Sequence, residues 1–143
     1  MGEVIREFQG ENRWLSNFWP SEVLYGGVKY PTVEHFYQAM KTKDVDVRIK
    51  IASLASPAEA KRFGKRLELR SDWLDIRDAV MRRGLELKFP SNRKWLGWRL
   101  VETNDTELIE GNSWGDTYWG VCNGVGENVL GNMLMRRRWE IKK

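Results

Sequence analysis

Residues 23–41 of this 143-residue chain read VLYGGVKYPTVEHFYQAMK, and they predict how the fold begins. Two short runs of β-prone residues, 23–25 and 28–30, flank a Gly-Gly pair that tolerates the positive φ of a tight turn. They predict a β-hairpin. After Pro31, Thr32 is a good helix cap, and apolar residues then recur at helical spacing, so we expect a helix over 33–41.

The remaining elements follow from the same signals. Ser56, Pro57 and Glu59 form a strong helix start, with a capping hydroxyl, a proline at the first helical position and a carboxylate three residues after the cap. Glycine, asparagine and tryptophan fill 111–126, which we expect to be a loop. We expect further helices over 45–54, 57–66, 73–88, 92–100 and 128–139, and short strands over 4–8 and 108–110. The pattern predicts an α+β fold, with residues 1–143 forming one mostly helical domain that carries a small antiparallel sheet.

Composition narrows the class of protein. Hydrophobic residues make up 41% and charged residues 31%, as in ordinary globular proteins. No apolar run is long enough to span a membrane, the first residues lack a signal-peptide layout, and the single Cys122 has no internal disulfide partner. We therefore expect a cytoplasmic protein. The net charge of +4 is compatible with an anionic partner, and Arg136 to Arg138 with Lys142 and Lys143 favour a solvated helix end over a nucleic-acid contact.

Two groups of residues are candidates for chemistry. Glu34, Gln38 and Lys41 share one helix face; on these residues alone, an exposed polar stripe is the favoured interpretation and a Glu34 directed into a pocket is the alternative. Residues 110–120 combine carboxylates with large aromatics, as suits a cation-like transition state beside a stacked base. The chain has eight tryptophans, more than packing alone requires, and His35 is the only histidine. We expect His35 to be a capping or buried, hydrogen-bonded residue, and we expect neither a metal site nor a cofactor.

Taken together, these segments resemble the NADAR/YbiA-like family over about residues 8–138. The resemblance is carried by motifs in the family's order: LSNFWP at 15–20, YPTVEHFYQAMK at 30–41, KRFG at 61–64, Trp73 with Arg77 and Met81, Lys88-Phe89, LIE at 108–110, Asp116-x-x-Trp119-Gly120, and Gly126-x-Asn128-x-Leu130-Gly131 followed by Leu134-Met135.

The resemblance implies a small α+β enzyme that hydrolyses N-glycosidic bonds. Its catalytic Glu maps onto Glu34 and its Asp onto Asp116. The substrate-binding set is a group of motif positions expected to line the pocket: Asn17, Lys41, Trp73, Trp114, Trp119, Gly120 and Asn128. Thr32, Trp114-Gly115 and Val121-Cys122 depart from the usual family residues, which leaves the substrate less determined than the reaction.

These residues suggest roles in cleaving a ribose C1–N bond. Glu34 would activate water or stabilise the oxocarbenium ion, and Asp116 would position water or hold the ribose hydroxyls. Lys41 and free backbone N–H groups near Asn128 would bind phosphate, while Trp119, with Trp73 or Trp114, would sandwich the base.

Four functions stay open at this point. The first is removal of ADP-ribose from ADP-ribosylated guanine, with nucleic acid as the partner. The second is cleavage of ribosylamino-phosphate intermediates of riboflavin biosynthesis. The third is an NAD- or ADP-ribose-binding module without turnover, and the fourth is a nucleic-acid-binding domain. The sequence does not specify the oligomeric state.

Overall fold

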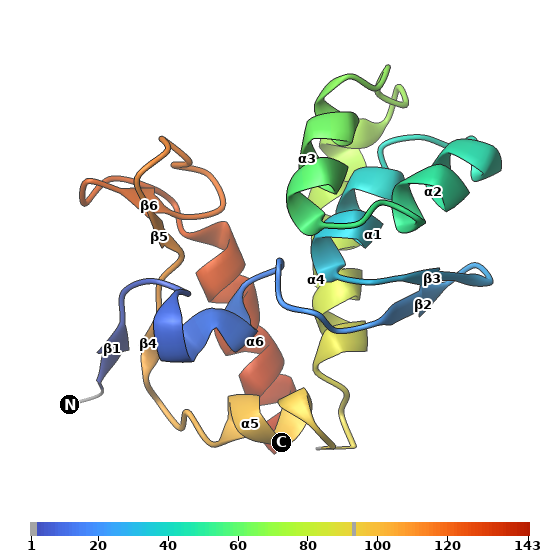
Figure 1. Cartoon of the computed structure of the whole chain (residues 1–143). Helices are drawn as coiled ribbons and strands as arrows, with labels where there is room; N and C mark the ends of the chain where they lie inside the picture. The colour runs from blue at the N-terminus through green and yellow to red at the C-terminus, as the bar shows by residue number, and fades with distance from the viewer. Residues whose placement is uncertain (1–2, 93) are drawn as a thin grey trace. The chain divides into compact units, whose positions relative to one another are not determined.

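The computed structural model describes residues 3–92 and 94–143, which fold as two compact units (Figure 1). The first unit comprises Met1–Ser16 and Phe89–Lys143, and the second comprises Asn17–Lys88. Helices dominate both units and strands occur only as short pairs, which confirms the α+β class. Met1, Gly2 and Arg93 lie outside the described residues.

The second unit begins with the predicted hairpin. Strands β2 (Val23–Tyr25) and β3 (Val28–Tyr30) pair antiparallel, and Gly26 and Gly27 adopt positive φ angles of 59° and 79° between them. Helix α1 (Val33–Ala39) follows, capped by Thr32, whose hydroxyl accepts a hydrogen bond from the His35 N–H. All seven residues of α1 are buried, so this short helix forms the centre of the unit.

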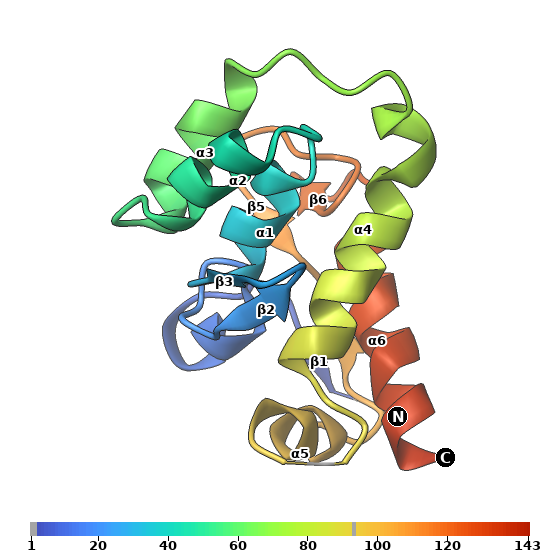
Figure 2. The same ribbon diagram turned by 90° about the vertical axis from the view of Figure 1, so that its right-hand side faces the viewer.

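Three helices surround α1 (Figures 1 and 2). Helix α2 (Val45–Ala52) starts at Asp44, whose carboxylate accepts from two backbone N–H groups. Helix α3 (Pro57–Lys65) starts at Ser56, which accepts from the Glu59 N–H as predicted. Helix α4 (Trp73–Lys88) has the predicted bounds. The predicted ends of α1 and α2 lay two residues too far along the chain, because the chain turns away at their C-caps, Met40 and Ser53.

The first unit is built on α6 (Val129–Lys142), with the shorter α5 (Leu96–Val101) and a 3-10 helix, η1 (Gly10–Leu15). Two strand pairs accompany them, β1 (Val4–Ile5) with β4 (Glu107–Leu108) and β5 (Gly111–Asn112) with β6 (Val121–Cys122). Both pairs are parallel, so the predicted antiparallel sheet is confirmed only for the hairpin. These strands join segments distant in sequence, and local alternation carries no information on the direction of a distant partner.

Two helix predictions in this unit need correction. The helix expected over 92–100 begins only at Leu96, because Trp95 adopts a φ of 53° that a helix does not allow. The last helix continues three residues beyond its predicted end at 139, to Lys142. Among the described residues, no helix combines the length and apolar character needed to cross a lipid bilayer.

Each unit has its own core. In the second unit, Phe36 of α1 makes edge-to-face contacts with two tyrosine rings of the hairpin, Tyr25 at 5.2 Å and Tyr30 at 5.8 Å between centroids. In the first unit, the ring of Trp14 meets that of Phe89 edge to face at 6.3 Å. Buried leucines complete the first core: Leu15, Leu100, Leu108, Leu130 and Leu134.

Candidate active site

Glu34 is a buried acid on the central helix of the second unit. Its side chain retains only 8% of its exposure, so the interpretation of Glu34, Gln38 and Lys41 as an exposed stripe is wrong. The other sides of α1 are covered as well, and its polar face is therefore interior. The Gln38 side-chain amide donates to Glu34 Oε2 at 2.5 Å, and the Glu34 backbone N–H donates to the Asn17 carbonyl at 3.1 Å.

Gln38 is held against Glu34 by α3. Gln38 is 4% exposed, and its Oε1 accepts no hydrogen bond within the described residues. The amide lies directly over Gly64, where an added Cβ would overlap Oε1 and lie 2.6 Å from Cδ. Position 64 must therefore be glycine for the Gln38 amide to keep this place. Gln38 lies on the helix face that the sequence predicts, but it was not among the predicted site residues; the signal for it was its i+4 spacing from Glu34.

Lys41, Tyr37 and Trp73 extend the same region. The Lys41 Nζ lies 5.7 Å from the Tyr37 ring centroid, and the Tyr37 ring meets Trp73 edge to face at 5.1 Å. Burial lowers the pKa of the Lys41 ammonium, Glu34 opposes that shift, and nearby Lys65 and Lys61 reinforce it. Trp73 is 5% exposed, so its ring is packed within the unit.

Asn17 completes this group. Its Nδ2 donates to the sulfur of Met81 at 3.3 Å, while its buried Oδ1 has no hydrogen-bond partner in the described parts of the chain. The second unit thus brings together four predicted site residues, Asn17, Glu34, Lys41 and Trp73, through contacts that also recruit Gln38 and Tyr37. A buried carboxylate beside an ammonium group and aromatic rings is an arrangement suited to general base catalysis on an anionic substrate.

The first unit holds the other predicted residues on one loop. Asp116 Oδ1 accepts from the backbone N–H groups of Tyr118 and Trp119 at 3.1 and 2.9 Å. Asn112 clamps the same turn, because its amide donates to the Asp116 carbonyl at 2.8 Å and accepts from the Asp116 N–H at 3.0 Å. Trp119 is half-buried with its ring edge to face against Tyr118, whereas Trp114 is exposed. Asp116 therefore fixes the backbone that presents Trp119.

Gly120 and Asn128 anchor this loop to α6. A Cβ at Gly120 would overlap the Glu110 carbonyl, and the Asn128 side chain bridges backbone groups, accepting from the Glu110 N–H and donating to the Leu108 carbonyl. The backbone N–H groups expected to be free for phosphate here are already used: those of Val129 and Leu130 donate to the carbonyls of Tyr118 and Trp119. That expectation was wrong because the loop itself caps the helix.

His35 has a structural environment. Its Nε2 lies 3.1 Å from the Leu54 carbonyl and its Nδ1 lies 2.8 Å from the Thr32 hydroxyl, so Nε2 carries the proton and Nδ1 accepts. Burial lowers the pKa of the imidazole. The prediction of a buried, hydrogen-bonded histidine is confirmed. Over residues 3–92 and 94–143, no cluster of three or more histidine, cysteine or acidic side chains is placed to hold a metal ion.

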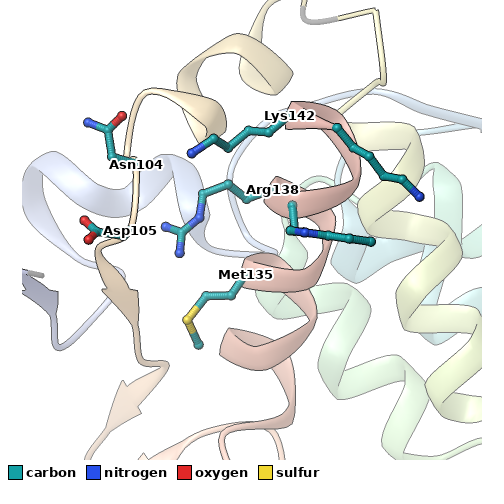
Figure 3. A pocket seen from close by; sticks show the side chains of 7 residues that line it. Asn104, Asp105, Met135, Arg138 and Lys142 are labelled. Carbon is teal, nitrogen blue, oxygen red and sulfur yellow. The ribbon is translucent and has the colours of Figure 1, made fainter.

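The basic end of α6 is exposed as predicted at Arg136, Lys142 and Lys143, but Arg138 is buried. Arg138 is 7% exposed, and its Nη1 donates to Thr103 Oγ1 and to the Thr106 carbonyl, both at 2.8 Å. It lines a pocket of about 420 Å³ between the last turns of α6 and the Asn104–Asp105 turn (Figure 3). None of the predicted site residues lines this pocket. The hydrogen bonds of Arg138 thus link α6 to the turn over residues 103–106.

Comparison with known proteins identifies the family. The model of the NADAR domain matches residues 5–142. The chain belongs to the NADAR domain family. Among its NADAR relatives, N-glycosidase YbiA of Escherichia coli (strain K12) is 37% identical over 132 residues, covering 89% of this chain and 80% of the relative. N-glycosidase Npun_R5314 of Nostoc punctiforme is 36% identical over 134 residues, covering 90% of this chain and 85% of the relative.

Two further matches extend the comparison. Riboflavin biosynthesis protein VVA0006 of Vibrio vulnificus is 38% identical over 133 residues, which cover 91% of this chain but only 36% of that protein. The solved NMR structure of the E. coli protein YbiA matches with a TM-score of 0.83 and 32% identity, over 99% of this chain and 87% of the other. The resemblance inferred from the motifs and the α+β fold class are both confirmed.

Proposed function

We propose that this NADAR chain removes ADP-ribose from ADP-ribosylated guanine in nucleic acid, by hydrolysing the bond between ribose C1 and a nitrogen of the base. The coarser activity follows from the relatives: the chain is a hydrolase of N-glycosyl bonds. The observation that carries the assignment to a site is the buried Glu34 carboxylate, oriented by Gln38 and neighboured by Lys41.

The chemistry follows from the charge that develops. As the C1–N bond breaks, its electron pair leaves with the base and positive charge builds on the ribose. A carboxylate shielded from water stabilises that charge far more strongly than an exposed one would. In the proposed reaction Glu34 takes a proton from the attacking water, whose oxygen bonds to C1, and this proton passes to the departing nitrogen, so that C1 ends with a hydroxyl group and the base with an N–H. The hydrogen bond from Gln38 fixes the orientation of the Glu34 carboxylate.

The other predicted residues have proposed roles in the same reaction. Lys41 would bind a phosphate of the substrate. The Asp116 carboxylate would position water or hold the ribose hydroxyls, and the half-buried Trp119 would stack on the leaving base, assisted by the exposed Trp114. The net charge of +4 favours a nucleic-acid substrate over a neutral one.

A second candidate substrate is a ribosylamino-phosphate intermediate of riboflavin biosynthesis. It is supported by the names of two relatives, VVA0006 and the maize chloroplastic protein PYRR. The chain spans 36% of the first and 20% of the second. A module that binds ADP-ribose without turnover would use Glu34 and Asp116 only as hydrogen-bond partners.

The test compares the substrates directly. The protein is incubated with ADP-ribosylated single-stranded DNA and, in parallel, with the ribosylamino-pyrimidine phosphate, and released ADP-ribose or ribose phosphate is measured by chromatography. We expect faster release from the DNA; exclusive cleavage of the pyrimidine compound would transfer the proposal to the second candidate. If neither product is released under excess enzyme, the result would support the module that binds ADP-ribose without turnover.

The role of Glu34 is tested by Glu34→Gln, which keeps the size of the side chain but removes its charge. We expect a folded protein whose kcat falls by about a thousandfold or more, because several kcal/mol of transition-state stabilisation is lost. Near-normal turnover by this variant would refute the assignment of Glu34.

A further inference from the structure

The positive charge of this protein belongs to the second unit. The first unit contains equal numbers of basic and acidic residues, so the whole excess of +4 lies in Asn17–Lys88, the unit that holds Glu34. Within that unit, α3 and its C-cap carry Lys61, Arg62, Lys65 and Arg66. The only acid of α3, Glu59, is used at the start of the helix, where its carboxylate accepts from the Ala55 N–H.

Basic residues near a helix C-terminus are often explained by the helix dipole. The helix dipole explains why α3 carries several basic residues, but not why two of them, Lys61 and Lys65, lie beside the contact between α3 and α1. Ala60 and Gly64 form the buried stripe of α3, and Gly64 lies against Gln38 of α1. Lys61 and Lys65 are one position further along and one turn apart, so they border this contact on the same side of the helix.

The charges of the two lysines are felt at Lys41. Burial is the largest cause of the lowered pKa of Lys41, Glu34 opposes that shift, and the positive charges of Lys65 and Lys61 add to it. Neither Lys41 nor Lys65 forms an ion pair with a carboxylate within residues 3–92 and 94–143. Lys61 and Lys65 lie one helical turn apart, like charges at that spacing destabilise a helix by a few tenths of a kcal/mol, and a bound anion would offset this repulsion.

The charges indicate which anion fits. Three ammonium groups and one carboxylate leave a net of two positive charges, and a phosphate monoester carries about −1.5 to −2 at neutral pH. We propose that Lys61 and Lys65 of α3, together with Lys41, form the binding site for the phosphate attached to the ribose of the substrate. This inference rests on the proposed function, because it assigns a second part of the same substrate to the region around Glu34 (Figures 1 and 2 show α3 against α1).

The same chemistry is present in two ligands, the monophosphate of ribose 5-phosphate and the diphosphate of ADP-ribose. Binding of each is measured by calorimetry at low and at physiological salt, with ribose as the uncharged control. Lys65→Ala and Lys61→Ala are each expected to weaken both phosphate-bearing ligands by about tenfold, which is about 1.4 kcal/mol, without changing the response to ribose. A larger loss for ADP-ribose than for ribose 5-phosphate would identify the diphosphate as the group that the lysines hold.

Arg62→Ala is the matched control. Arg62 lies on the same helix, is exposed like Lys65 and loses the same charge, but it lies on the face opposite the buried Ala60–Gly64 stripe. We expect it to bind both ligands like the unaltered protein. Equal weakening by Arg62→Ala and Lys65→Ala would show a diffuse electrostatic effect and overturn the proposal, as would unchanged affinity in both lysine variants or no binding to the unaltered protein.

Binding is measured without turnover, so the two proposals fail separately. Phosphate binding that depends on Lys61 and Lys65, in a protein that cleaves no N-glycosyl substrate, would keep this site and reject the proposed function. Normal cleavage of ADP-ribosylated DNA by both lysine variants, with unchanged KM, would keep the function and reject this site.

Discussion

Gly64 provides a test of the idea that α3 positions the catalytic carboxylate. In Gly64→Ala the new methyl group would overlap Gln38 Oε1 and lie 2.6 Å from Cδ, so the Gln38 amide must move away from Glu34. Glu34 then loses a charge-assisted hydrogen bond in a buried position, which is worth about 1.5–3 kcal/mol. If that bond serves the transition state, kcat falls by about tenfold to a hundredfold.

Gly64→Ala should lose stability as well as activity, so the two effects are measured separately. Inserting a methyl group into a packed contact costs about 1–3 kcal/mol, and alanine in place of glycine returns about 1 kcal/mol of helix propensity. Single-turnover cleavage therefore measures the effect on chemistry, and urea unfolding measures the effect on the fold.

Gly84→Ala is the matched control for this experiment. Gly84 is also a helical glycine packed on α1, but its added Cβ would meet Val33 at 3.1 Å and Phe36 at 3.2 Å, on the apolar face away from Gln38. We expect a similar change in unfolding free energy and an unchanged kcat. Equal kcat values for folded Gly64→Ala and the unaltered protein would refute the positioning role.

Three further predictions concern single residues. Asp116→Asn keeps an oxygen that accepts from the Tyr118 and Trp119 N–H groups, so we expect this variant to bind ADP-ribose normally but to turn over substrate slowly. Asp116→Ala should lose binding as well. Full activity in Asp116→Asn would show that Asp116 has only a structural role. Burial lowers the pKa of His35 below its ordinary value of 6.5, so the unfolded chain binds that proton more readily, and the unfolding free energy should fall as the pH drops below about 6.5. Urea midpoints between about pH 7.5 and 5.5 measure this, and an equally steep fall in His35→Gln would contradict it. Arg138→Ala should lower the unfolding free energy by about 2–3 kcal/mol through the loss of its two internal hydrogen bonds. The exposed Arg136→Ala should lower it by less than about 0.5 kcal/mol. Equal losses in the two variants would contradict the structural role of Arg138.

Local signals in the sequence predicted the second unit well. The Gly26-Gly27 turn, the Thr32 and Ser56 caps and the span of α4 all depend on residues that are neighbours in sequence, and the structure confirms each of them. The parallel strand pairs of the first unit could not be predicted in this way, because each joins residues about ten to a hundred positions apart.

The candidate site shows the same division. The spacing of Glu34 and Gln38 is visible in the sequence, but the burial of that face is not, because it depends on α3 and α4 covering a helix of only seven residues. Gln38 was missed because the glycine that holds its amide is 26 positions away on another helix. Asn128 was assigned to phosphate because a Gly-rich helix start is locally indistinguishable from one already capped by a distant loop.

That capping has a consequence for motion. The carbonyls of Tyr118 and Trp119 accept from the first amides of α6, so the segment that presents Trp119 cannot swing away without fraying a helix. Most of its conformational entropy is already lost before any ligand arrives, and a ligand that stacks on Trp119 would meet a preorganised surface. Slow hydrogen exchange at the Val129 and Leu130 amides would report this rigidity directly, and ligand should slow it little further.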